Sequence, residues 1–204
     1  MNGRAVARRM ALCCRQLAAH GLIAGRDGNL SVRLGPQRIL VTPSGRIKAL
    51  LTAADMVEVD PAGRPRRSGR RKPTSELDLH LRTLRHRPDV QAIVHAHPPT
   101  ATGFAVAGQE IPSNMLPELI FVVGPVPLVP FGKSGTPELG DRVVPFLEDT
   151  RCNALLLANH GAVTMGKTLD EAWIRMESLE QSARIIRAAQ EIGQPKPPPL
   201  RSDA

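Results

Sequence analysis

The order in which strand-like and helix-like segments alternate along the chain limits its fold more strongly than any other feature. An amphipathic segment at the N-terminus predicts a first helix, and three short strand-like segments follow at residues 29–34, 38–42 and 56–60. Beyond them, helices are predicted at 74–90, 99–108, 136–149 and 168–193, and strands at 91–97, 120–131, 153–161 and 162–166. This mixed order predicts α/β layers in which helices cover a largely antiparallel sheet.

A single domain accounts for the length of the chain. With 204 residues, it can bury a substantial core without disulfides or metals to hold it together. We assign residues 1–193 to this domain and residues 194–204 to a flexible, proline-rich tail that lacks the apolar residues needed for packing. No apolar run reaches the roughly 18 residues of a membrane span, so we expect no membrane partner.

The N-terminal segment begins with basic residues followed by apolar ones, as a signal peptide does. However, Arg15 interrupts the apolar stretch, and Met10, Cys13 and Leu17 recur at helical spacing. We therefore predict a helix of the mature protein. The three cysteines are an odd number without the spacing of a disulfide framework, which favours a reducing, cytoplasmic location.

A net charge of +8 raises the question of a nucleic-acid partner. Much of the charge lies in the segment GRPRRSGRRK, residues 63–72. The chain has no tyrosine, one tryptophan and four phenylalanines, so it lacks the aromatic side chains on which bases stack, and we expect no nucleic-acid partner. Two interpretations of the basic segment remain: a solvated loop, or a loop that attracts an anionic substrate.

Two of the six histidines stand one residue apart in the stretch AIVHAHPPT. Because side chains alternate along a strand, His95 and His97 should point to the same face, where a divalent metal could bind both imidazoles. His160 also follows an apolar strand and precedes a glycine. The pair alone is compatible with metal ligands or with hydrogen-bonded core histidines, whereas three histidines with one open position are typical of catalytic zinc.

A metal that polarises a carbonyl group needs a neighbouring base to move a proton. Glu76 is the candidate, because it opens the helix that precedes the histidine strand. We expect Thr74 or Ser75 to cap this helix and Glu76 to lie in its first turn. The alternative role for Glu76 is a favourable interaction with the positive end of the helix. His80 shares a helix face with Glu76 and is expected to be exposed or hydrogen-bonded.

Three polar stretches before the histidines suit an anion: RDGNLS at 26–31, TPSG at 42–45 and KPTSE at 72–76. Glycine lets backbone N–H groups approach an anion, Ser, Thr and Asn side chains donate hydrogen bonds, and a helix start adds a positive dipole. Each stretch alone is an ordinary turn or cap. The three together predict a phosphate pocket beside the metal.

The motifs GNLS, TPSG, KPTSE, HAHP and NHG follow one another in the order and approximate spacing of the class II aldolase/adducin family. Over residues 5–190 the chain resembles the zinc-dependent L-fuculose-phosphate aldolases of that family. The resemblance implies an α/β/α sandwich around a mostly antiparallel sheet, one Zn²⁺ per chain, and a homotetramer with active sites between subunits. It also implies roles for zinc ligands (His95, His97, His160), an acid/base (Glu76) and residues that bind substrate phosphate (Asn29, Ser44, Gly45, Thr74, Ser75).

The chain departs from this resemblance at one catalytic position. The fuculose-phosphate aldolases use a tyrosine after the metal strand as a further proton donor, but the corresponding stretch SNMLPELIF has Leu116 or a near neighbour in its place. We predict that Glu118 supplies this proton. The alternative is that Glu118 is a surface or structural carboxylate.

The resemblance and these residues together predict a metal-dependent aldolase that reversibly cleaves a ketose 1-phosphate to dihydroxyacetone phosphate and an aldehyde through a zinc-stabilised enediolate. Fuculose, 5-deoxyribulose and methylthioribulose 1-phosphates share the phosphate end that such a site would hold. A methylthioribulose-1-phosphate dehydratase and a sugar-phosphate 4-epimerase are alternatives on the same scaffold. A non-catalytic assembly module of the adducin type is disfavoured, because adducin head domains lack the metal histidines.

Overall fold

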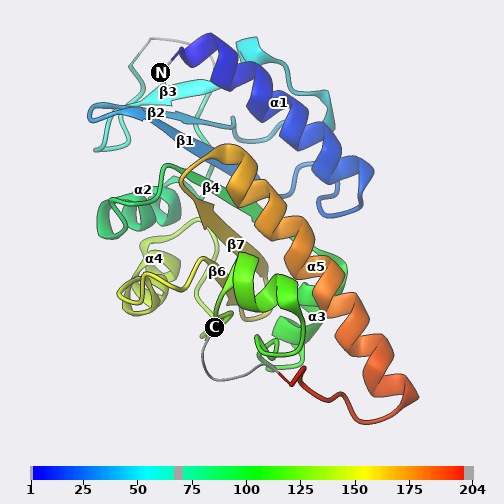
Figure 1. Ribbon diagram of the computed structural model, residues 1–204. Coiled ribbons are helices and arrows are strands. Elements are labelled where there is room, and N and C mark those ends of the chain that lie inside the picture. The colour runs from blue at the N-terminus through cyan, green and yellow to red at the C-terminus, as the bar shows by residue number, and fades with distance from the viewer. Residues whose placement is uncertain (1, 67–70, 200–204) are drawn as a thin grey trace.

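A mixed sheet forms the centre of the protein, with helices packed on both of its faces (Figure 1). The computed structural model describes residues 2–66 and 71–199. Within these residues the sheet has seven strands in the order β3-β2-β1-β4-β7-β6-β5, and all neighbouring pairs are antiparallel except β5 and β6. The strands are β1 (Asn29–Gly35), β2 (Arg38–Val41), β3 (Val57–Val59), β4 (Ala92–Ala96), β5 (Leu128–Val129), β6 (Ala154–Leu157) and β7 (Gly161–Gly166).

Five α-helices and four short helical turns complete the described fold. The α-helices are α1 (Gly3–Ala19), α2 (Leu77–His86), α3 (Pro99–Val106), α4 (Pro137–Val143) and α5 (Leu169–Ile192). The short turns are η1 (Lys48–Leu50), η2 (Ala53–Asp55), η3 (Glu118–Val123) and η4 (Val144–Leu147). In the described part of the chain, no helix is both long and apolar enough to cross a membrane.

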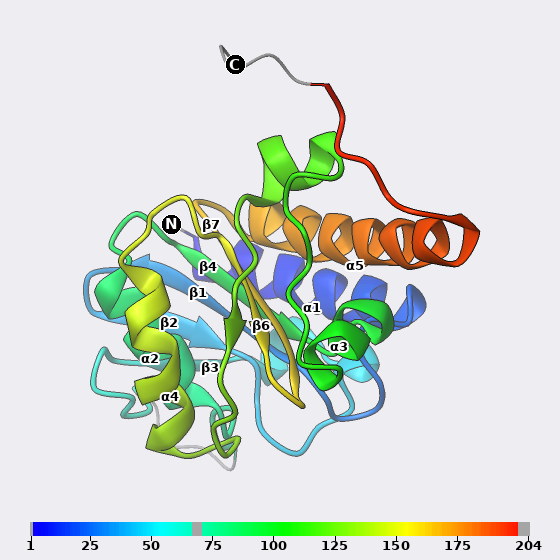
Figure 2. The ribbon, with the colours of Figure 1, turned by 90° about the horizontal axis from the view of Figure 1, so that it is seen from below.

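Helices α1, α3 and α5 cover one face of the sheet, and α2 and α4 cover the other (Figure 2). Each face buries its own apolar core, because successive strand residues point in opposite directions. On β4, Val94 belongs to the core under α1 and α5, and Ile93 to the core under α2 and α4. By the same alternation His95 points toward the α2 side. The predicted α/β/α sandwich with a mostly antiparallel sheet is confirmed.

The N-terminal segment forms helix α1, as its periodicity predicts. Met10, Cys13 and Leu17 are fully buried on the sheet, so the segment is an integral part of the core. All three cysteines are free and buried. Burial raises the pKa of Cys14 to about 12 and that of Cys152 to about 11, which keeps these thiols protonated and unreactive at neutral pH.

The strand predicted at 120–131 is wrong over its first half. Residues Glu118–Val123 form the π-helical turn η3, and only Leu128–Val129 form a strand. The apolar, β-branched sequence favours a strand locally. Leu119 and Val123 are four residues apart, however, and a helical turn places both of them in the core shared with α5, where they are fully buried. Burial of both side chains outweighs the local preference.

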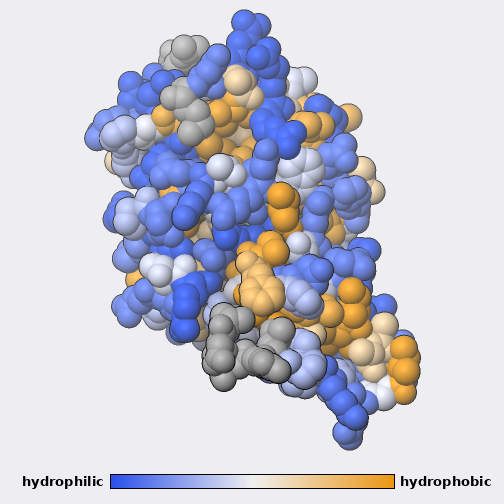
Figure 3. Space-filling view, viewed as in Figure 1, coloured by the Kyte–Doolittle hydropathy of each residue, from blue (hydrophilic) through white to orange (hydrophobic). Residues whose placement is uncertain are grey.

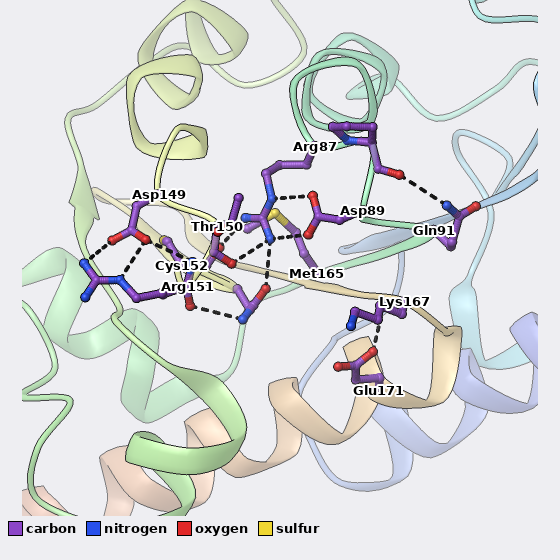
Figure 4. Close-up of polar contacts among 12 residues, drawn as sticks. Arg87, Asp89, Gln91, Asp149, Thr150, Arg151, Cys152, Met165, Lys167 and Glu171 are labelled. Carbon is purple, nitrogen blue, oxygen red and sulfur yellow. Dashed lines mark hydrogen bonds and ion pairs between the residues drawn. The ribbon is translucent and has the colours of Figure 1, made fainter. Parts of the chain in front are cut away.

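The side chain of Arg87 ties the end of α2 to the start of β6 (Figure 4). It is 1% exposed and makes two hydrogen bonds of 2.9 and 2.8 Å to the carboxylate of Asp89. Its remaining bonds reach the carbonyl oxygens of Thr150 (3.0 Å) and Cys152 (2.6 Å) and the side chain of Asn153 (3.1 Å). The buried guanidinium group of Arg87 therefore links the end of α2 to the segment that leads into β6.

Two predicted features fall partly outside the described residues. Arg67 and Arg70 of the basic segment lie there, as do residues 200–204 of the predicted tail. Helix α5 ends at Ile192, and residues 194–199 form no helix or strand. The flexible tail therefore stays a prediction.

Candidate active site

Three histidines converge at one end of the central strands. His95 lies in β4, His97 follows its last residue, and His160 directly precedes β7, which pairs with β4. One ring nitrogen from each lies within 4.8 Å of those of the other two. Gly161 permits this approach, because a Cβ atom there would lie 2.6 Å from the backbone oxygen of Ala96. The fold thus brings together the three histidines that the sequence singled out.

The imidazole rings of this cluster are oriented for ligation. Nδ1 of His95 donates to the carbonyl oxygen of Ala162 (2.9 Å), so its Nε2 is unprotonated in the neutral ring. Nε2 of His95 lies 3.3 Å from Nε2 of His97. Nδ1 of His97 lies 3.8 Å from the carboxylate of Asp27. Histidine ligands of metals commonly donate their second nitrogen to a carbonyl or carboxylate, as His95 does here. The separation of 3.8 Å between His97 and Asp27 is too long for a hydrogen bond, and Nδ1 of His160 is buried without a hydrogen-bond partner among the described residues. The donor set fits a divalent ion such as Zn²⁺.

Glu76 faces the histidines from the start of α2. The residue is 6% exposed, and its two carboxylate oxygens lie 3.2 Å from Nε2 of His95 and 3.3 Å from Nε2 of His160. Asn29 and Ser134 donate hydrogen bonds of 2.7 and 2.8 Å to it. Burial alone would raise the pKa of Glu76, but the positive charge that His95 and His160 carry when protonated, together with the hydrogen bond from Asn29, outweighs burial and holds the pKa well below its usual range. The carboxylate is ionised, as a proton acceptor or a metal neighbour must be.

The predicted capping of α2 is wrong in detail. Helix α2 begins at Leu77, so Glu76 is the residue before the first turn, and its side chain makes no capping hydrogen bond. Neither Thr74 nor Ser75 occupies the cap position; the hydroxyl of Thr74 instead accepts a hydrogen bond from the backbone N–H of Glu76 (3.3 Å). Glu76 occupies the N-cap position, but its side chain makes no capping hydrogen bond, so its carboxylate is free to turn toward the histidines.

The three polar stretches predicted to bind phosphate lie around this cluster. Asn29 pairs directly with His95 across β1 and β4. The stretches 42–45 and 72–76 run side by side, joined by two backbone hydrogen bonds of 3.0 Å. Of the five predicted phosphate residues, Asn29 and Thr74 are buried, whereas Ser44, Gly45 and Ser75 are exposed. Exposed donors beside a buried carboxylate are accessible to an anion that enters from solvent.

The described ends of the basic segment are engaged in ion pairs. Arg66 lies 3.2 Å from the carboxylate of Glu58, and Arg71 lies 2.9 Å from that of Asp55. These acidic partners offset part of the positive charge near the polar loops. Attraction of a substrate by this segment stays a prediction.

Glu118 opens η3 and is exposed. Among the described residues it has no hydrogen-bond or ion-pair partner, and it is not among the groups that contact the histidine cluster within this chain. Leu116, near the expected tyrosine position, is half-buried against the core. The role of Glu118 in proton transfer therefore stays a prediction.

Sequence reasoning missed Ser134. This serine lies 58 residues after Glu76 and reaches its carboxylate from the loop between β5 and α4. The glycines that flank it in GKSGT are the only local signal of a close approach. His80 was expected to be either exposed or hydrogen-bonded. It is fully buried and hydrogen-bonded.

Comparison with known proteins gives a consistent result. Residues 8–186 match the family model of the class II aldolase and adducin N-terminal domain. An L-fuculose phosphate aldolase of Methanococcus maripaludis is 34% identical over 84% of this chain and 91% of its own length. A 5-methylthioribulose-1-phosphate/5-deoxyribulose-1-phosphate aldolase of Rhodospirillum rubrum is 35% identical over 96% of this chain and 87% of its own. The crystal structure of a putative aldolase/epimerase/decarboxylase from Klebsiella pneumoniae matches with a TM-score of 0.87 and 31% identity, covering 100% of this chain and 97% of that one.

Proposed function

Because this chain belongs to the class II aldolase and adducin family, we propose that it is a zinc-dependent aldolase that reversibly cleaves a ketose 1-phosphate to dihydroxyacetone phosphate and an aldehyde. The observation that carries the proposal is the ionised, buried carboxylate of Glu76 within 3.3 Å of two imidazoles of the histidine cluster. An ionised carboxylate at this position can accept a proton and so act as a base. The three histidines of the cluster could hold a divalent metal, which would act as a Lewis acid.

In the proposed reaction, the histidines and Glu76 have different roles. A divalent metal held by His95, His97 and His160 would supply a positive charge that stabilises the enediolate of the three-carbon phosphate. Cleavage removes the proton from the C4 hydroxyl of the ketose and breaks the C3–C4 bond, which releases the aldehyde. Glu76 takes up a proton and delivers it to C3 of the enediolate, which gives dihydroxyacetone phosphate, and in the reverse reaction it removes that proton from C3.

The substrate phosphate is assigned to the polar loops. Asn29, Thr74 and Ser75 offer side-chain donors, and the turn at Ser44 and Gly45 offers backbone N–H groups. Support comes from the position of these loops beside Glu76 and the histidines. The names of the relatives favour a fuculose, 5-deoxyribulose or 5-methylthioribulose 1-phosphate as the substrate.

Dehydration and 4-epimerisation are the alternatives on the same scaffold. An epimerase would break and remake the bond that the aldolase cleaves, and a dehydratase would need a second carboxylate for elimination of water. We assign Glu118 to proton transfer on the aldehyde side, since the chain has no tyrosine. An assembly module of the adducin type is disfavoured by the complete set of histidines and Glu76.

We further propose that the protein is a cytoplasmic homotetramer. The cytoplasmic location is supported by three free, buried cysteines. For assembly, Figure 3 shows apolar side chains gathered over η3 and the adjoining part of α5, where Phe121 is 63% exposed and Ile174 is 53% exposed. Apolar patches of this kind mark protein contacts. Light scattering coupled to gel filtration should give four times the mass of the 22.0 kDa chain.

The decisive experiment incubates zinc-loaded protein with a panel of ketose 1-phosphates and separates the products by mass. Dihydroxyacetone phosphate with an aldehyde supports the aldolase, loss of water would move the assignment to a dehydratase, and an epimer without cleavage to an epimerase. Metal content is measured in parallel on His95→Ala and on the control variant His86→Ala. His86 is exposed, and its ring is hydrogen-bonded to the carbonyl oxygen of Arg82. We expect about one zinc per chain in wild type and His86→Ala and a large loss in His95→Ala. Unchanged metal in His95→Ala would reject the ligand set.

A further inference from the structure

Four polar side chains form a hydrogen-bonded row between α2 and β1 that ends at the Glu76 carboxylate. Ser31 and His80 at its inner end are fully buried. Oγ of Ser31 lies 2.7 Å from Nδ1 of His80, and Nε2 of His80 is hydrogen-bonded to Oδ1 of Asn29. Nδ2 of Asn29 lies 2.7 Å from Glu76. A buried imidazole is thus linked to the proposed acid/base through a single amide.

The row follows from the periodicity of the two elements. Asn29 and Ser31 are two residues apart on β1, so their side chains point to the same face of the sheet. Glu76 and His80 are four residues apart at the start of α2, so they occupy the same side of the helix. The two pairs meet between α2 and β1, where Ser31, His80 and Asn29 are buried and satisfy one another's polar groups by hydrogen bonds.

Each hydrogen bond in the row can run in only one direction. Asn29 donates its NH₂ group to Oε2 of Glu76, so its carbonyl oxygen, which can only accept, faces Nε2 of His80. His80 therefore has its proton on Nε2, and its bare Nδ1 accepts from the hydroxyl of Ser31. Burial lowers the pKa of His80 to about 3, which keeps the ring neutral, as this arrangement requires.

We propose that His80 is a positioning residue: its Nε2–H group fixes the orientation of the Asn29 amide, and Asn29 in turn holds the Glu76 carboxylate toward the histidine cluster. The consequence for turnover rests on the proposed function of Glu76. Without the His80 donor, the carbonyl oxygen of Asn29 loses its buried partner, and the amide is held at one end only, by its bond to Glu76. The second N–H of Asn29 is not used by Glu76, so the same amide can also donate to the substrate phosphate.

A buried polar residue can also act on stability alone, and α2 contains one. Thr83, three residues after His80, is fully buried, and its hydroxyl donates to the carbonyl oxygen of Leu79 in the same helix (2.8 Å). Among the described residues, no hydrogen bond joins Thr83 to the row that ends at Glu76. Thr83→Val is therefore a matched control for the loss of a buried polar group from α2.

Steady-state kinetics of three variants test the proposal. The glutamine of His80→Gln can still direct an N–H group to Asn29, whereas the leucine of His80→Leu cannot. We expect kcat of His80→Leu to fall roughly 10- to 100-fold, the usual effect of losing an outer partner of a metal-site residue, with a smaller change in KM and in zinc content. His80→Gln should retain most of kcat, and Thr83→Val all of it. Wild-type kcat in His80→Leu, or equal losses in both His80 variants, would overturn the proposal.

A second measurement needs neither substrate nor an active variant. Nitrogen-15 spectra of the histidine side chains of the wild-type protein should show His80, assigned by its absence from His80→Gln, with its proton on Nε2, and Asn29→Ala should shift that signal. A proton on Nδ1 would mean that Asn29 is reversed, and would overturn the proposal. A wild type that turns over no ketose phosphate would count against the proposed function, whereas the tautomer is decided without it.

Discussion

Replacement of Arg87 by methionine should destabilise the protein strongly, although the residue lies outside the proposed active site. Methionine can fill much of the space of the arginine stem but makes none of its hydrogen bonds. The substitution removes two charge-assisted bonds to Asp89 and leaves the carbonyl oxygens of Thr150 and Cys152 without this donor. The side chain of Asp89 is 40% exposed, so water can solvate it after the change.

These contacts set the expected magnitude. Removal of one partner from a buried ion pair costs about 3–5 kcal/mol, mainly because the other charge is stranded. Partial exposure of Asp89 places this case at the lower end, and unsatisfied carbonyl groups add to it. We expect a loss of about 3 kcal/mol in the free energy of unfolding, which for a chain of this length lowers Tm by roughly 6–12 °C.

Urea unfolding and thermal melting followed by circular dichroism measure this loss. Arg151→Met is the matched control, because Arg151 lies in the same region (Figure 4) and pairs with Asp149, but its side chain is 80% exposed. Surface pairs of this kind contribute little, so the control should melt like wild type. Equal melting of the two variants would refute the view that burial makes Arg87 important for stability.

Other predictions concern the site. Glu76→Gln should lose two or more orders of magnitude of kcat, the usual effect of removing a positioned base, and retain its metal; turnover and metal analysis check this. Ser75→Ala should raise KM for the ketose phosphate with little change in kcat, since it removes a donor to the phosphate and none to the reacting carbons. Glu118→Gln should slow cleavage but leave proton exchange on dihydroxyacetone phosphate intact, which tritium exchange would reveal. Acid should destabilise wild type more than His80→Gln. The pKa of His80 is lowered to about 3 in the folded protein, so the unfolded chain alone gains this proton as pH falls below about 6.5. Urea unfolding should show an extra loss of roughly 2–3 kcal/mol between pH 7 and 4.5.

Much of the architecture could be predicted from local patterns. The period of the apolar residues identifies α1 and α5, because each of these helices has one face in a core. The central strands are buried on both faces and are identified instead by short, continuous apolar runs. The same reasoning fails at η3, where the sequence of residues 120–123 favours a strand and packing against α5 decides otherwise. The local pattern of apolar residues carries no information about the contact between η3 and α5. The two segments are far apart in the sequence: Val122 of η3 and Arg175 of α5, which are hydrogen-bonded, are 53 residues apart.

The convergence of the three histidines could be predicted from the sequence, but the contacts that surround them could not. His95, His97 and His160 are marked by their positions at the ends of strands, and strand pairing brings such positions together. Ser134 and the row that contains His80 depend on how α2 and the loop before α4 lie against β1, which no local pattern fixes. Glu76 was predicted as the acid/base, but its place before the first turn depends on the backbone geometry at Leu77.

Both edges of the sheet are poor templates for strand addition. Edge strand β3 has three residues, and its outer side is already occupied by residues 64–66 of the same chain, through a bridge between Val59 and Pro65 and two backbone hydrogen bonds of 3.0 and 2.9 Å. The opposite edge, β5, has two residues and is flanked by Pro127 and Pro130, which have no N–H group to offer. Short, self-covered or proline-bounded edges protect a protein from aggregation. Amyloid-like stacking of this chain would first require one of its edges to unfold.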